Sequence, residues 1–143
     1  MLPTAPDLRR HAHDLAKAFH VNLVEAVQMA RTPEAAIAIP MGRTVVVAPI
    51  TDESTYAIAL HEMGHLVSPW GALHGTGNLT REAEDAAWAW AKHYALEWTP
   101  FMEKVATWAR SSYDAVESPP ATKPAPPAPA APIGQQINWR KWR

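Results

Sequence analysis

Apolar residues recur at helical spacing over much of this chain. In residues 7–19 they lie on one face, with Arg9, Arg10 and Asp14 off that face, which indicates an amphipathic helix. Further helices are predicted where this spacing follows a polar N-cap or precedes a proline. They are expected at residues 22–30, 53–67, 81–98 and 101–116, with a glycine-rich loop at residues 71–80.

Two short apolar runs interrupt the helical pattern and predict β-strands. They cover residues 36–39 and 44–48, and the second contains Val45, Val46 and Val47. β-Branched residues of this kind favour strands, and the proline and glycine between the two runs favour a turn. Helices combined with a small sheet predict an α+β fold.

The composition changes sharply near the C-terminal end. Seven of the fifteen residues from 118 to 132 are proline and five are alanine, which is typical of an extended, polyproline-like linker. We therefore expect one domain at residues 1–117, a linker at residues 118–132 and a tail at residues 133–143. The tail contains Trp139, Arg140, Lys141, Trp142 and Arg143, and two interpretations stay open: a peptide that docks weakly on a partner, or a disordered end.

Charge and composition narrow the classes of function. The net charge of −1 gives no bias toward nucleic acid or an anionic membrane, so neither is expected as a direct ligand. The absence of cysteine excludes disulfides, thiolate zinc sites and cysteine nucleophiles. No apolar stretch suits a signal peptide or a membrane span, which favours a cytoplasmic protein.

The stretch Tyr-Ala-Ile-Ala-Leu-His-Glu-Met-Gly-His in the third predicted helix carries the strongest chemical signal. His61 and His65 are four residues apart, so both imidazoles can face one metal ion from the same side of a helix. Glu62 is placed beside such an ion as a general base for a water molecule. Seven histidines and nine glutamates in 143 residues make about 0.02 such patterns expected by chance, so two unrelated surface histidines are the weaker interpretation.

A catalytic zinc site needs a third protein ligand. Glu84 is the preferred candidate because it shares a predicted helix face with the apolar residues Ala87, Trp88, Ala91 and Ala95. A carboxylate on an inward face is costly to bury unless a metal or hydrogen bonds compensate. Glu82 and Asp85 are expected on solvated faces of the same helix. Gly64 is expected to leave space beside the metal.

These residues resemble the ImmA/IrrE-type metallopeptidases, which belong to the gluzincin class of zincins. The resemblance rests on the histidine helix, on the 18 residues between His65 and Glu84, and on the Glu-x-x-Ala-Trp pattern that ends at Trp88. It implies a minimal zincin-like fold with Zn²⁺ held by His61, His65 and Glu84, and with Glu62 as the catalytic base. It also implies an extended protein substrate paired with an edge strand, at residues 36–39 or 44–48. Characterised members of the family cleave helix-turn-helix repressors.

Some features depart from the wider class or leave alternatives open. Thermolysin-type gluzincins usually have an aspartate four residues after the glutamate ligand, where this chain has Trp88. His74, His93 and Tyr94 are all candidates for a donor to the transition state. Two other functions stay open: a binding protein that uses the zincin fold without turnover, and a structural zinc site closed by a fourth ligand such as His74.

Overall fold

The computed structural model describes residues 2–74 and 80–117, and these form an α+β fold. Within these residues the α-helices are α1 (Ala5–Ala18), α2 (Glu53–Val67), α3 (Pro69–His74), α4 (Arg81–Tyr94) and α5 (Pro100–Glu117), and the strands are β1 (Asn22–Glu25), β2 (Ile37–Ile39) and β3 (Thr44–Val47). Two single-turn 3₁₀ helices, Val27–Met29 and Pro33–Ala35, lie between β1 and β2. No helix in the described ranges is long and apolar enough to cross a membrane. The predicted linker and tail lie outside the described residues.

The sheet has the order β1-β3-β2, with β3 in the centre. β1 pairs parallel to β3, with Leu23 opposite Val45, and β2 pairs antiparallel to β3, with Ala38 also opposite Val45. The predicted strand at residues 44–48 is therefore a central strand and does not offer an edge to a substrate. Of the two strands proposed for that role, only β2 lies at an edge.

The helix predicted at residues 22–30 is wrong. α1 ends at Ala18, His20 takes a positive φ of 57°, and the chain then enters β1. The backbone N–H of Asn22 donates to the carbonyl oxygen of Arg43, so β1 is held by a segment about twenty residues further along the chain. This long-range pairing outweighs the local helical spacing.

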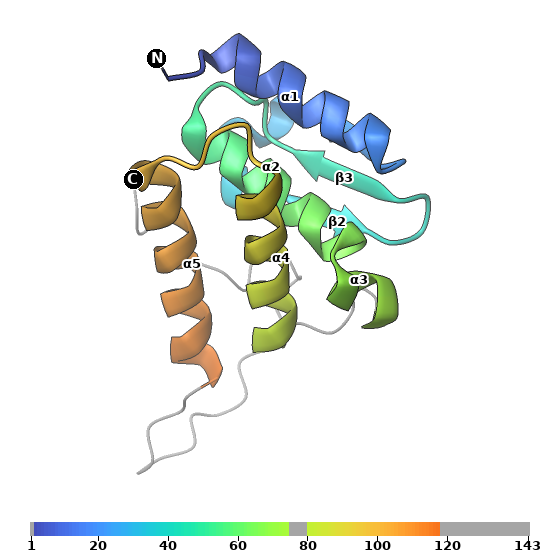
Figure 1. Cartoon of the computed structure of the whole chain (residues 1–143), viewed down its shortest axis with the longest axis vertical. Coiled ribbons are helices and arrows are strands. Elements are labelled where there is room, and N and C mark those ends of the chain that lie inside the picture. The colour runs from blue at the N-terminus through green and yellow to red at the C-terminus, as the bar shows by residue number, and fades with distance from the viewer. Residues whose placement is uncertain (1, 75–79, 118–143) are drawn as a thin grey trace.

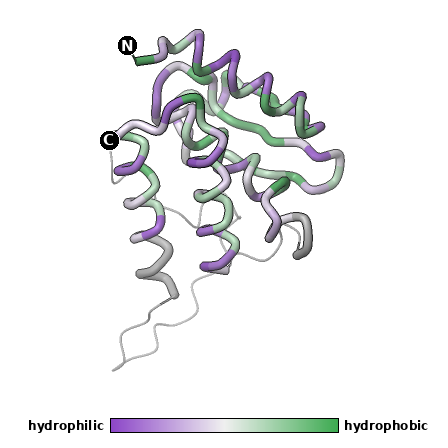
Figure 2. The backbone as a smooth tube through the Cα atoms, in the orientation of Figure 1, coloured by the Kyte–Doolittle hydropathy of each residue, from purple (hydrophilic) through white to green (hydrophobic). Residues whose placement is uncertain are grey.

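α2 is the central element of the domain. It contacts α1, β2, β3, α3, α4 and α5 (Figure 1), and every residue from Thr55 to Leu66 is buried. Its first turn is secured by Asp52, whose side chain accepts a hydrogen bond from the backbone N–H of Thr55 at 2.8 Å. Figure 2 shows hydrophilic positions along the outer helix α1 and a hydrophobic run in β3, as expected for a domain built around one core.

The first part of the predicted loop at residues 71–80 is helical, and residues 75–79 lie outside the described ranges. Residues 69–74 form α3, and a Cβ atom at Gly71 would collide with the carbonyl oxygen of His65. Glycine therefore lets α3 fold back tightly against the end of α2. α4 also differs from the prediction: it ends at Tyr94, four residues earlier than expected.

Candidate metal centre

Two helices bring the predicted ligands together. His61 and His65 are one turn apart on α2, and Glu84 lies in the first turn of α4. Thr80 caps α4 by accepting a hydrogen bond from the backbone N–H of Ala83 at 3.1 Å, which fixes the turn that carries Glu84. All three ligand candidates are buried, with exposed fractions of 0% for His61, 8% for His65 and 3% for Glu84.

The three side chains converge on one small space. The Nε2 atoms of His61 and His65 are 3.1 Å apart, and each is 3.1 Å from one carboxylate oxygen of Glu84. Ligand atoms roughly 2.0–2.1 Å from a tetrahedral zinc ion lie about 3.3 Å from one another. Two neutral imidazole nitrogens and a carboxylate in this arrangement suit zinc or a similar divalent ion.

Gly64 has a structural role in addition to the predicted one. A Cβ atom at this position would lie 2.6 Å from the carbonyl oxygen of Ala87 and 2.9 Å from its Cα atom. Gly64 therefore allows α2 and α4 to pack backbone against backbone, one turn from Glu84. Its main contribution is the spacing of the two ligand-bearing helices, in addition to the absence of a bulky side chain.

Burial and charge set the proton affinities at this centre. Burial raises the pKa of Glu62 to about 8; His65 opposes this rise and Glu84 adds to it. Burial lowers the pKa of His61. Burial also acts to lower the pKa of His65, but the hydrogen bond to Glu84 and the negative charges of Glu84 and Glu62 together outweigh this and raise it. Burial alone would raise the pKa of Glu84, but the two imidazoles hold it well below its usual value. Glu84 is therefore an anion in this cluster.

Trp88 contacts one of the candidate metal ligands, which the sequence analysis did not predict. Its ring stacks on the imidazole of His61, with ring centroids 4.1 Å apart and an interplanar angle of 25°. It is also 3% exposed, in agreement with the predicted packing in the core. The sequence could have indicated this contact, because Trp88 lies one helical turn after Glu84 on the same face of the helix. Trp88 thus restricts the orientation of one candidate ligand.

The remaining predicted candidates lie elsewhere. Glu82 is exposed, as predicted, and Asp85 forms a surface ion pair with Arg110 at 3.0 Å. His93 and Tyr94 lie at the far end of α4 and line a separate pocket. The side chain of His74 is outside the part of the chain that the structure describes. Among the described residues, the cluster suited to a metal ion is therefore His61, His65 and Glu84.

Comparisons with known proteins do not assign this centre to a family. No protein-family model, curated protein or solved structure matches the chain.

Proposed function

We propose that this chain is a zinc metallopeptidase with a minimal zincin-like fold of the ImmA/IrrE type. The observation that carries this proposal is the buried convergence of His61, His65 and Glu84, with Glu62 adjacent to His61 on the same helix. The three ligand candidates would hold the ion. A structural site has no need for an additional buried carboxyl group beside the ligands, so Glu62 favours a catalytic site.

The proposed reaction is hydrolysis of a peptide bond. Zinc, when bound, supplies Lewis acidity toward the scissile carbonyl and lowers the pKa of water. Glu62 accepts a proton from the attacking water as the oxygen–carbon bond forms. It then donates that proton to the amide nitrogen as the carbon–nitrogen bond breaks. Burial raises the pKa of Glu62 when the centre holds no metal, and a divalent ion beside it would favour the ionised form that accepts the proton.

The substrate class follows from the resemblance and from the sheet. An extended segment of a protein can add to the free edge of β2 through backbone hydrogen bonds. β2 is three residues long and contacts α2, the helix that carries the two histidines. A helix-turn-helix repressor supplied as a separate protein is the proposed substrate.

Metal analysis with three variants tests this function. We expect one zinc ion per natural chain, loss or weakening of zinc in Glu84→Ala, and retention of zinc in Glu62→Gln. Glu82→Ala is the matched control, because Glu82 lies on the same turn of α4 but is exposed. Full zinc content in Glu84→Ala would contradict the assignment of the third ligand.

Cleavage assays then separate the catalytic proposal from its alternatives. Candidate repressors are incubated with the natural chain and with Glu62→Gln, and fragments are measured by mass spectrometry. Cleavage by the natural chain alone supports Glu62 as the base, and equal cleavage by both refutes it. Equal binding of a partner by both proteins without cleavage favours the binding-protein alternative. A fourth protein ligand, seen by X-ray absorption and lost in His74→Ala, favours a structural site.

A further inference from the structure

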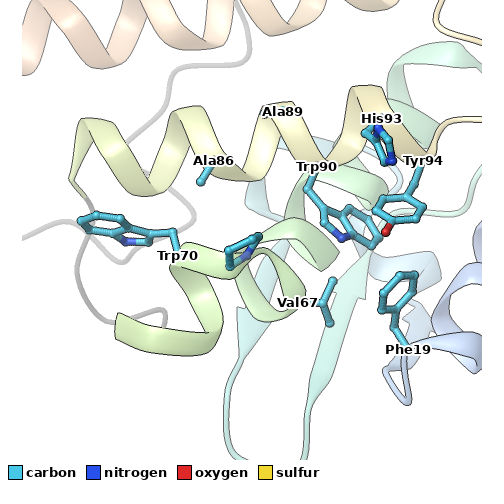
Figure 3. Close-up of a pocket in the computed structure, with 9 residues that line it drawn as sticks. Phe19, Val67, Trp70, Ala86, Ala89, Trp90, His93 and Tyr94 are labelled. Carbon is cyan, nitrogen blue, oxygen red and sulfur yellow. The ribbon is translucent and has the colours of Figure 1, made fainter.

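A pocket of about 520 Å³ lies beside α4, and none of the candidate metal ligands lines it. Trp70 stands at one end of it, and Phe19, Trp90 and Tyr94 stand at the other, with Ala86 between them on α4 (Figure 3). None of the described residues that line it is a lysine, arginine, aspartate or glutamate. The pocket therefore offers aromatic walls, small side chains between them and no fixed charge.

The aromatic end of this pocket is held in place by its own contacts. The ring of Phe19 meets those of Trp90 and Tyr94 edge to face, with centroids 5.3 Å and 5.1 Å apart. Trp90 and Tyr94 are also in contact, at 4.9 Å. Trp90 is buried, whereas Tyr94 is 36% exposed. Rings fixed in this way form a surface that can bind an apolar segment with little loss of side-chain entropy.

Aromatic-lined grooves of this kind suit a polyproline II segment. Prolines fill the spaces between aromatic rings, and the preformed helix loses little entropy on binding. The eight-residue step from Ala86 to Tyr94 along α4 corresponds to roughly 12 Å. A polyproline II helix rises about 3.1 Å per residue, so this span matches about four residues, the length of a Pro-x-x-Pro motif. Tyr94 and His93 can donate hydrogen bonds to its backbone carbonyl groups.

The chain contains such a segment directly after α5. Residues 124–127 and 126–129 both have the pattern Pro-x-x-Pro, and Lys123 is the one charged residue between positions 118 and 132. Six residues, 118–123, separate the end of α5 from the first Pro-x-x-Pro pattern, and an extended segment of this length reaches roughly 20 Å. α4 and α5 are in contact and run in opposite directions (Figure 1), so the segment leaves α5 near the first turns of α4, at the part of the pocket that Ala86 lines. The basic tail that follows is less suited to an uncharged pocket.

We propose that the Pro/Ala-rich segment, residues 118–132, docks as a polyproline II helix into the pocket between Trp70 and Tyr94. Docking would attach the C-terminal part of the chain to α4 and hold the basic tail beside the domain. This inference is independent of metal binding and catalysis, because neither the segment nor the pocket includes a candidate ligand.

Paramagnetic relaxation in the full chain tests this contact. The sequence has no cysteine, so Ala128→Cys carries a single nitroxide label. The indole N–H signals of the tryptophans, assigned by single Trp→Phe substitutions, report which part of the domain the label approaches. Docking predicts a larger loss of intensity at Trp70 and Trp90 than at Trp108. Trp108 is the reference because it lies on α5, the helix from which the segment extends.

Three variants of the labelled chain complete the experiment. Replacing Pro124, Pro126, Pro127 and Pro129 with alanine should abolish the selective loss, and so should Tyr94→Ala. Phe101→Ala should preserve it, because Phe101 is a similarly exposed aromatic residue that does not line the pocket. Equal loss at Trp90 and Trp108, or selective loss that survives the proline substitutions, would overturn the proposal. Loss seen only between labelled and unlabelled chains in a mixture would also overturn it, because the contact would then be intermolecular.

Discussion

Replacing Gly64 with alanine should weaken metal binding although alanine adds no functional group. The new Cβ atom would lie 2.6 Å from the carbonyl oxygen of Ala87, against an ordinary contact of at least 3.4 Å. The Cβ atom is fixed to the backbone of α2 and the oxygen belongs to the backbone of α4, so neither can rotate away and the two helices must separate by about 0.8 Å. Metal–ligand distances vary by only about 0.2 Å in well-formed sites. Glu84, one turn before Ala87, would then lie too far from His61 and His65 to complete the ligand set.

The expected magnitudes follow from this displacement. We expect zinc affinity to fall roughly 10- to 100-fold, as when residues that support metal ligands are removed. Overpacking lowers the unfolding free energy by about 1–3 kcal/mol, and the better helix propensity of alanine raises it by about 1 kcal/mol. The metal-free variant should therefore lose at most about 2 kcal/mol of unfolding free energy.

Competition with a chromophoric chelator measures the zinc affinity, and urea denaturation without metal measures the stability. Ala89→Gly is the matched control, because Ala89 is an exposed residue of α4 and its replacement destabilises the helix by about 1 kcal/mol without forcing the helices apart. The control should retain the zinc affinity of the natural chain. An unchanged zinc affinity in Gly64→Ala would refute the argument that helix spacing sets the site.

Other interactions give three further predictions. Trp88→Leu should weaken zinc binding and change the absorption spectrum of the cobalt-substituted protein. Trp88→Phe should keep the zinc affinity and the spectrum of the natural chain, because either aromatic ring can stack on His61. Glu25→Gln should lower the unfolding free energy by about 1–3 kcal/mol near neutral pH, because Glu25 accepts hydrogen bonds from a backbone amide and two side chains. The pKa of Glu25 in the folded state is lowered from 4.5, so its contribution to stability is present above pH 4.5 and is lost as the pH falls through the folded-state pKa. Urea titrations at several pH values test this. A stability difference between the natural chain and Glu25→Gln that did not shrink in acid would contradict it. Tyr56→Phe should cost about 1–3 kcal/mol, because the backbone N–H of Leu96 loses its acceptor, and an unchanged urea midpoint would exclude that role.

The sequence alone determined the features that depend on local periodicity. His61 and His65 face the same way because a helix repeats every 3.6 residues, and this holds wherever the helix lies in the fold. Glu84 could be selected because a carboxylate on an otherwise apolar helix face needs a compensating partner. The structure places these three side chains within reach of one ion.

Only the tertiary structure decided the features that depend on distant partners. The residues of β1 have a helical apolar spacing, and they form a strand because the backbone of β3 is available to pair with them. The role of Gly64 depends on Ala87, which approaches it from another helix at a distance that no sequence pattern records. The same applies to the stacking of Trp88 on His61 and to the pocket between Trp70 and Tyr94. Each requires two segments to pack together, and packing is determined by the whole core.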